Sequence, residues 1–588
     1  MYTTEFNCQI LIALLKAHGI KRVVASPGTT NVAFVGSVQN DPWFEVYSAI
    51  DERHGAYMAV GMAAETDEPV VLSCTGATAS RNYIPALTEA YYRKLPILAV
   101  TSTQVFARRG QLFDQNMDRS QIQKDIALLS VNCPIIHVDY ERDYCERVVN
   151  EAILEMKRHG GGPVHLNLET LYPRDFTVKQ LPKVNKINRI GVDTDIWPEI
   201  SDSSKVIVYI GSHRKFSRRE EMALETFLRN HQAVAFVSMV SSYCGYGALS
   251  NQLVCMQGLR NHPRYGHFKP DLIIHIGEIS ADYGWGFIND VAPVWRVSED
   301  GQIRNRFMRL VNVFEMPMAM FFEHYNITNG EPAQNDYWVE WKNLDAHIRS
   351  KFPELPFCNT WIAKRLYEKM PMGAVFHAGI LSSLRSFDYL PPLEHVEGHC
   401  NVGGFGIDGC VSSLIGGAIV VPSKLHFGMV GDLAFFYDLN ALGNRQIINN
   451  LRILVVNNGE GVEFSLYKNP GGQFGKHTAD YIAAGRHFGN KSHELLKHYA
   501  TDLGFRYLTA ENKDEFDKVI DEFTTQERDK PILFECFVEK QAEIDSVELV
   551  THIEHYVPEQ HVPEPSLRSH VGKYIPTRLK TVIKRIIK

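Results

Sequence analysis

The sequence predicts an α/β protein with three doubly wound domains, each a parallel sheet covered by helices on both faces. Two observations lead to this prediction. Short apolar runs recur along the 588 residues, separated by stretches with helical spacing, which is the pattern of βαβ units. The runs are apolar throughout rather than alternating with polar residues, as expected of parallel strands that are buried on both faces.

The first domain is predicted over residues 1–180. Its strands are expected in KRVVASPG, FEVYSAI, EPVVLSC, PILAVTS and GGPVHLNLET, and its helices include residues 52–65 and 82–93. A polar, proline-containing stretch of about residues 175–203 predicts a linker to the next domain.

A central domain is predicted over residues 190–350 and a third over 358–545. The central strands are expected in KVIVYIGS, AVAFVSMV and DLIIHIGE, followed by a charged helix near residues 336–357. In the third domain we expect strands in KLHFGMVGD, RILVVNN and PILFECFV, with a helix through residues 438–450. The first and third domains look alike in layout, and residues 546–588 form a tail.

Composition narrows the function classes. The net charge is −7, from 61 basic and 68 acidic residues, so nucleic acid is not the expected partner. No run approaches the roughly 20 apolar residues of a membrane span, and the N-terminus lacks the basic leader of a signal peptide. The ten cysteines include no C-x-x-C pair and are expected to be reduced and mostly buried. Together these features predict a cytoplasmic protein.

Two neighbouring strand ends of the third domain carry oxygen donors. Gly431-Asp432 ends one apolar strand and Asn457-Asn458 ends the next. In an open parallel sheet such ends line the ligand crevice, and carboxylate and amide oxygens suit Mg²⁺ or Ca²⁺ with positions left for phosphate. A backbone carbonyl of residues 459–461 could complete the set. Either half alone is more simply a helix cap or a turn, but the two together favour a metal site.

This GD…NN pair resembles the diphosphate-metal signature of thiamine diphosphate (ThDP) enzymes. GIDG (406–409), VGDLAFFYDLNAL (430–442) and VVNNGEGVEFSL (455–466) further resemble the family of the menaquinone-pathway 2-succinyl-5-enolpyruvyl-6-hydroxy-3-cyclohexene-1-carboxylate synthase. SPGTTN, DERHGAYMAVG, CTGATASRN and PALTEA follow in that family's order. The resemblance covers nearly all of residues 1–540 and is vague in the central domain.

The resemblance implies a set of site residues and two cofactors, ThDP and Mg²⁺. Glu52 would hydrogen-bond the cofactor's aminopyrimidine ring, so that the ring can take the proton from the thiazolium carbon. The other implied contacts are grouped by role: metal, Asp432, Asn458 and Glu460; cofactor, Gly404, Gly406, Ile407, Asp408, Asp432, Leu433, Asn458 and Phe464; substrate, Thr29, Thr30, Asn31 and Gln121. In this superfamily the glutamate and the metal site meet across a subunit interface, which implies a homodimer or homotetramer.

The chain departs from the family where carboxylates would bind. Thr29, Thr30 and Asn31 stand where the family has Ser-Arg-Ser, and Val402 replaces another arginine; a third is replaced by an apolar residue in GGAIVV. Because arginine is the preferred carboxylate binder, the exact family reaction is not expected. Arg108 and Arg109 could replace the lost contacts or could be surface charges.

The expected activity is a ThDP-dependent decarboxylation of a 2-oxo acid with transfer of the resulting acyl carbanion equivalent to an acceptor. Two alternatives stay open: a simple 2-oxo acid decarboxylase, and a catalytically idle, membrane-associated assembly protein. The last idea comes from Pro576–Lys588, where aliphatic and basic residues alternate at helical spacing as in a short amphipathic helix at an anionic membrane surface. Docking on its own body, or disorder, is the simpler explanation of this tail.

Overall fold

A computed structural model describes residues 1–118, 122–326, 334–466, 468–486 and 492–556. It contains three sheets whose strands pair only in parallel, each with helices between the strands. This confirms the predicted fold class. The first and third sheets fall within one predicted range each, and the middle sheet does so except for residues 188 and 189 of its edge strand. The domain boundaries themselves stay a prediction.

The first domain has the strand order β2-β1-β3-β4-β6-β5. Helices α1 and α6 cover one face, and α3 and α5 cover the other. The elements are α1 (Phe6–Ala17), β1 (Arg22–Ala25), α2 (Val32–Val38), β2 (Glu45–Ser48), α3 (Glu52–Thr66), β3 (Val70–Thr75), α4 (Ala77–Asn82), α5 (Ile84–Arg93), β4 (Ile97–Gln104), η1 (Phe106–Arg108), β5 (Leu129–Cys133), α6 (Asp139–Glu155), η2 (Arg158–Gly160) and β6 (Val164–Thr170).

The middle domain has the order β10-β9-β8-β11-β12-β13-β7. Successive strands are added toward one edge of the sheet from β8 to β10 and toward the other from β11 to β13, so the switch point lies between β8 and β11. Its elements are β7 (Asn188–Gly191), β8 (Val206–Ile210), α7 (Arg218–Asn230), β9 (Ala233–Val237), η3 (Met239–Ser241), β10 (Ala248–Ser250), α8 (Asn251–Cys255), η4 (Leu259–Asn261), α9 (Tyr265–Phe268), β11 (Leu272–Ile276), η5 (Gly284–Phe287), β12 (Val294–Val297), β13 (Leu310–Glu315), α10 (Met318–Tyr325) and α11 (Asp336–Ser350).

The third domain has the order β15-β14-β16-β17-β19-β18, which repeats the order of the first domain strand for strand. The similar layout expected from sequence is therefore a shared topology. Its elements are α12 (Asn359–Lys369), β14 (Val375–Ala378), α13 (Ser382–Asp388), β15 (Glu397–Cys400), α14 (Cys410–Val420), β16 (His426–Gly431), α15 (Asp432–Tyr437), η6 (Leu439–Gly443), β17 (Leu451–Asn457), η7 (Val462–Ser465), η8 (Pro470–His477), α16 (Thr478–Tyr481), α17 (Leu495–Asp502), β18 (Arg506–Ala510), α18 (Lys513–Phe523), β19 (Ile532–Phe537) and α19 (Lys540–Thr551).

Two local predictions were wrong. The expected linker contains β7, an edge strand that pairs with β13 from Asn188 opposite Asn312 to Gly191 opposite Glu315. The expected helix over residues 438–450 is only the short η6, because α15 precedes it and the chain turns at Asn444, whose side chain accepts the backbone N–H of Gln446 at 2.9 Å.

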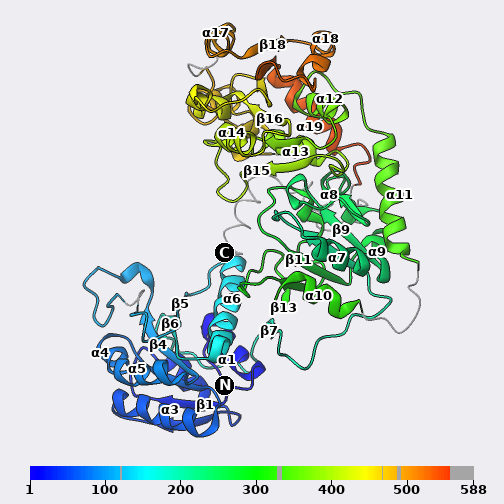
Figure 1. The fold of residues 1–588 in the computed structure, drawn as a ribbon. Coiled ribbons are helices and arrows are strands. Elements are labelled where there is room, and N and C mark those ends of the chain that lie inside the picture. The colour runs from blue at the N-terminus through cyan, green and yellow to red at the C-terminus, as the bar shows by residue number, and fades with distance from the viewer. Residues whose placement is uncertain (119–121, 327–333, 467, 487–491, 557–588) are drawn as a thin grey trace, which may run out of the picture.

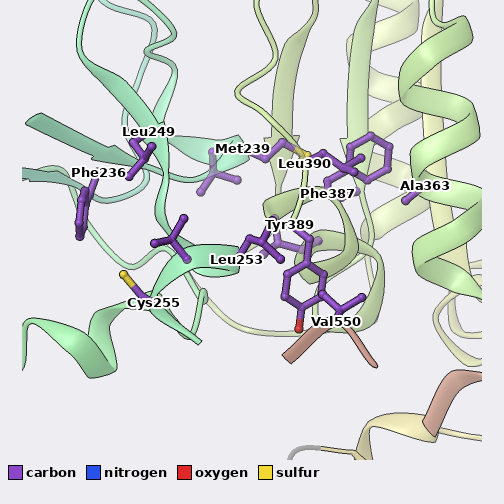
Figure 2. Packing of buried hydrophobic residues seen from close by; sticks show 14 of the residues in the cluster. Phe236, Met239, Leu249, Leu253, Cys255, Ala363, Phe387, Tyr389, Leu390 and Val550 are labelled. Carbon is purple, nitrogen blue, oxygen red and sulfur yellow. The ribbon is translucent and has the colours of Figure 1, made fainter. Parts of the chain in front are cut away.

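The middle and third domains share one apolar core, whereas the first domain has cores of its own. Figure 2 shows Met239 and Leu253 of the middle domain beside Leu390 and Tyr389 of the third. In Figure 1 the first domain lies at one end of the molecule and the third at the other, with the middle domain between them.

The expected thiols are also confirmed, since all ten cysteines are free and eight of them are buried. Within the described ranges, no helix has the length and apolar character needed to cross a membrane. Gln121 and the tail helix predicted at Pro576–Lys588 lie outside the described residues.

Candidate active site

The predicted metal ligands lie together at the carboxyl edge of the third sheet. Asp432 is the first residue of α15, directly after β16, and Asn458 directly follows β17. These two strands pair along their whole length, up to Gly431 opposite Val456, so their ends are adjacent. The switch point of this sheet, where the order of successive strands reverses, lies next to them, between β14 and β16. Open α/β sheets bind ligands at such a point.

The donor atoms at this edge are oxygens. Asp432 is 1% exposed, and the side-chain oxygen of Asn458 accepts the backbone N–H of Glu460 at 3.3 Å. The Glu460 carboxylate forms an ion pair with Lys540, and its backbone oxygen accepts the N–H of Val462 at 2.9 Å. A carboxylate, an amide oxygen and a backbone oxygen form the kind of donor set that Mg²⁺ accepts when phosphate oxygens and water complete its shell.

The glycines beside these donors border open space. A Cβ added to Gly403, Gly404 or Gly431 would meet no other atom within 4 Å, so a ligand could approach the backbone there. Gly406 is constrained differently, because a Cβ there would lie 2.3 Å from a carboxylate oxygen of Asp408. The residues present therefore fit a diphosphate and its metal.

The remaining cofactor residues surround the same edge. Ile407 packs against the shared core and Asp408 is exposed. Leu433 is half-buried on α15. The Phe464 ring, in η7, lies 3.3 Å from where a Cβ of Gly461 would stand, so it packs on the loop after β17. Their contacts with a cofactor stay predictions.

In the first domain, Glu52 and the Thr29–Asn31 turn follow neighbouring strands β2 and β1. Asp51 caps α3 by accepting the N–H groups of Arg53 and His54 at 2.9 and 3.2 Å, which fixes Glu52 as the first helical residue. Glu52 is half-buried, and its charge is one contributor to the raised pKa of Tyr83, after burial and Cys74.

Two of the predicted substrate residues have structural roles in this turn. Thr30 and Asn31 are both 1% exposed, and the Asn31 amide donates to the backbone oxygen of Ser26 at 2.8 Å. Thr29 is exposed. Substrate contact by these residues, and by Gln121, stays a prediction.

One chain does not bring Glu52 to the metal ligands. In Figure 1, α3 lies at the end of the molecule opposite β16 and α14, beyond the middle domain. The predicted residues therefore do not all meet within one chain.

Sequence reasoning missed a large cavity and the charged residues around it. The cavity, of about 660 Å³, is bordered by residues of all three domains, with Tyr209 and His275 at the switch point of the middle sheet and Phe405 from the loop after β15. Its walls are rich in arginine: Arg147, Arg296, Arg304, Arg306 and Arg385.

A buried ion pair connects this cavity to the predicted cofactor loops. Arg385, on α13, is paired with Glu463, in η7, and Tyr283 donates its hydroxyl to the same Glu463 carboxylate at 3.2 Å. The available signal was a charged residue inside each of two apolar segments, SSLRSFD and GVEFSL.

The two arginines suggested as replacement anion binders have partners within their own loop. Arg108 donates to Gln104 at 3.0 Å and lies 4.9 Å from the centre of the Phe113 ring. Arg109 donates to Asp118 at 3.2 Å and lies over Phe106. These contacts favour a local role for both.

Comparison with known proteins identifies the family of the chain. Residues 8–123 match the family model for the N-terminal TPP-binding domain of thiamine pyrophosphate enzymes, thiamine pyrophosphate being another name for ThDP. The synthase that makes 2-succinyl-5-enolpyruvyl-6-hydroxy-3-cyclohexene-1-carboxylate in Bacteroides thetaiotaomicron is 30% identical over 565 residues, covering 92% of this chain and 97% of that protein. The chain belongs to this synthase family.

Other members are similar over a comparable length. The synthase of Phocaeicola vulgatus is 29% identical over 563 residues, covering 92% of this chain and 97% of the relative. That of Desulfotalea psychrophila is 26% identical over 542 residues, covering 89% and 96%. The chain is thus a ThDP enzyme of the synthase family, as the sequence motifs predicted.

Two of the positions where the family resemblance places an arginine are buried in this chain. Val402, which stands where the family resemblance places an arginine, is only 4% exposed and belongs to the shared core. Thr30 is likewise buried. Neither position offers a charge to a ligand.

Proposed function

We propose that the protein uses ThDP and Mg²⁺ to decarboxylate a 2-oxo acid and to join the remaining carbon unit to an acceptor. The observation that carries the proposal is the meeting of Asp432 and Asn458 at the ends of paired strands, beside glycines that border open space. When bound, ThDP would supply the positively charged ring that accepts electrons as carbon dioxide leaves.

The chain's own residues would hold and orient the cofactor. Asp432, the Asn458 amide oxygen and the Glu460 backbone oxygen would bind Mg²⁺. The described part of the chain contains no group of three or more His, Cys, Asp or Glu side chains that could hold a metal ion. This metal would therefore also depend on amide, backbone and diphosphate oxygens. The loop at Gly403 and Gly404 would contact the diphosphate, and Glu52 of a second subunit would hold a proton at its carboxylate beside the pyrimidine ring.

A homodimer, or a tetramer built from dimers, is therefore part of the proposal. Large apolar side chains are exposed near both edges that would meet: Ile50, Tyr57, Phe106, Leu112 and Phe113 in the first domain, and Phe405, Tyr437, Phe474 and Tyr481 in the third. Apolar surface of this kind is typical of an interface between subunits.

We propose that the substrates differ from the pair used by the named relatives. The name of these relatives describes a 2-succinyl product, and a succinyl group retains a carboxylate, so its donor is a dicarboxylate. Thr30 and Val402 are uncharged and stand where the family resemblance places arginines that could bind such a donor. The arginine-lined cavity supports an anionic acceptor, because guanidinium groups bind carboxylates well.

Cofactor binding is tested with Asp432→Ala in the full chain. We expect ThDP with Mg²⁺ to raise the melting temperature of the wild type but not of this variant, since only the folded protein binds the ligand. Asp521→Ala, which removes an exposed aspartate of the same domain, is the control and should respond like the wild type. Equal stabilisation of all three proteins would reject the site.

The reaction is tested with a panel of 2-oxo acids. Carbon dioxide is measured with and without candidate acceptors, and products are identified by mass spectrometry. Carbon dioxide release without an acceptor-derived product would identify a simple decarboxylase, and no release from any 2-oxo acid would contradict the proposed chemistry.

A further inference from the structure

Glu463 and Arg385 form an ion pair that is almost fully removed from solvent. Their side chains are 10% and 4% exposed. Arg385 donates to one oxygen of the Glu463 carboxylate, and the Tyr283 hydroxyl donates to that same oxygen at 3.2 Å. The guanidinium also lies 3.9 Å from the centre of the Tyr283 ring. The carboxylate is thus held by residues from two domains.

The pair lies between the arginine-lined cavity and the predicted cofactor loops. Arg385, Tyr283 and Phe405 line the cavity. Glu463 belongs to η7, which begins directly after the loop that carries Asn458 and includes Phe464. The pair therefore joins the cavity wall to the loop that carries the predicted metal ligand Asn458.

The second oxygen of the Glu463 carboxylate determines which ligand groups could bind beside the pair. This oxygen, Oε2, is buried and accepts no hydrogen bond from any residue that the structure describes. A buried acceptor without a donor is unfavourable, so a ligand that donates a hydrogen there would gain binding energy. A ligand carboxylate would meet the opposite situation, because Glu463 already supplies the carboxylate that Arg385 would bind, and a second negative charge beside it is repelled.

We propose that Glu463 is a specificity-determining residue that excludes a second carboxylate on the 2-oxo acid and favours an uncharged group with a hydrogen to donate. The inference rests on the proposed function and names its donor class: a monocarboxylic 2-oxo acid with a hydroxyl group at its far end.

Three donors of similar length test this selection. They are 4-hydroxy-2-oxobutanoate, 2-oxopentanoate and 2-oxoglutarate, which carry a hydroxyl, a methyl and a carboxylate at the far end. With the full-length protein, ThDP and Mg²⁺, we expect kcat/KM for carbon dioxide release to fall in that order. The hydroxyl donor should exceed 2-oxoglutarate by at least tenfold.

Glu463→Gln keeps the shape of the side chain and removes its charge. In this variant we expect kcat/KM for 2-oxoglutarate to rise at least tenfold relative to the other two donors, because Arg385 can then bind the added carboxylate. Glu278→Gln is the matched control: Glu278 also borders the cavity and pairs with Arg296 at 2.9 Å, but its side chain is 54% exposed. It should leave the ratio between donors unchanged.

The outcomes separate this inference from the proposed function. A wild type that uses 2-oxoglutarate as well as the hydroxyl donor would overturn the role of Glu463, and so would an unchanged ratio in Glu463→Gln or an equal shift in Glu278→Gln. If Glu463→Gln does not fold, the preference of the wild type among the three donors still decides. If no donor is decarboxylated, calorimetric titration of the ThDP-loaded protein with the same donors tests the preference without catalysis.

Discussion

The contact between the first and middle domains depends on Glu315, and its removal should loosen that contact. Glu315 ends β13 and accepts hydrogen bonds from Arg158 of η2 at 2.9 and 3.1 Å. Arg189 approaches the same carboxylate at 3.6 Å. The side chains of Glu315, Arg158 and Arg189 are 15%, 16% and 10% exposed. We predict that Glu315→Gln destabilises this junction.

The expected size follows from burial. Breaking a fully buried pair costs about 3–5 kcal/mol, and an exposed pair contributes about 0–1 kcal/mol. The Glu315 network lies between these limits, and Arg158 and Arg189 would still have Glu155 at 3.5 and 3.3 Å. We therefore expect a loss of about 2 kcal/mol, which for a domain of this size lowers Tm by about 4–8 °C.

The loss should also depend on pH. Burial raises the pKa of Glu315, but the hydrogen bonds and charge of Arg158 outweigh it and hold the pKa below its ordinary value of 4.5. A carboxyl with a lowered pKa stabilises the folded state above the ordinary value and loses that effect as the pH falls through the lowered one. The difference between wild type and Glu315→Gln should thus be full near neutral pH and shrink in acid.

Scanning calorimetry of the full chain measures the lowest-temperature transition, since a multidomain protein need not unfold in one step. Glu323→Gln is the control, because Glu323 binds Arg219 through two bonds of 2.7 Å but on the surface. It should change nothing measurable. Equal shifts in the two variants, or a Glu315→Gln difference that grows in acid, would refute the reasoning from burial.

Three further predictions concern the site, the third domain and the tail. Glu52→Gln should bind ThDP normally but slow hydrogen–deuterium exchange at the thiazolium carbon, because an amide cannot exchange the needed proton; wild-type exchange rates would remove Glu52 from this role. Arg452→Met should lower Tm without changing ThDP affinity, since the fully buried Arg452 donates to backbone oxygens of Asn449 and Glu527, at 2.9 and 2.6 Å, at the amino ends of β17 and β19; a changed affinity at unchanged Tm would contradict this. Deleting Pro576–Lys588 should abolish salt-sensitive co-sedimentation with anionic vesicles and spare catalysis; equal sedimentation of both proteins would exclude a membrane role.

Much of the fold could be predicted because its central strands are buried on both faces. The strands β8, β9 and β11 are buried along their whole length. Most strands that escaped prediction are edge strands, whose outer side is not paired: β5, β7, β10, β15 and β18. The interior strands β12, β13 and β14 were missed as well. β5 (LSVNC) is mostly half-buried and β7 (NRIG) is largely polar, so neither contains an apolar run. Their pairing depends on partners far away in the sequence.

In the candidate site, too, the residues placed by local sequence could be predicted, and the contacts between distant segments could not. Asp432 and Asn458 could be predicted because each follows an apolar strand directly, and neighbouring parallel strands end at one edge. The pairing of Arg385 with Glu463 could not, because 78 residues separate them and a charged residue in an apolar segment does not identify its partner. Thr30 and Asn31 show the converse: their position in a motif was visible, but not their burial.

The shared topology of the first and third domains explains why neither can hold the whole site. Gly76 caps α4 and Gly431 caps α15 at the same place in the two sheets. The next residue is Ala77 in the first domain and Asp432 in the third, so only the third domain offers the proposed metal ligand there. After the second strand of each sheet the situation reverses, since the first domain presents Glu52 and the third presents Gly403 and Gly404. Two domains with one fold therefore carry complementary residues. In the proposed dimer, the Glu52 edge of each first domain would face the Asp432 edge of the partner subunit's third domain, which would give two complete sites.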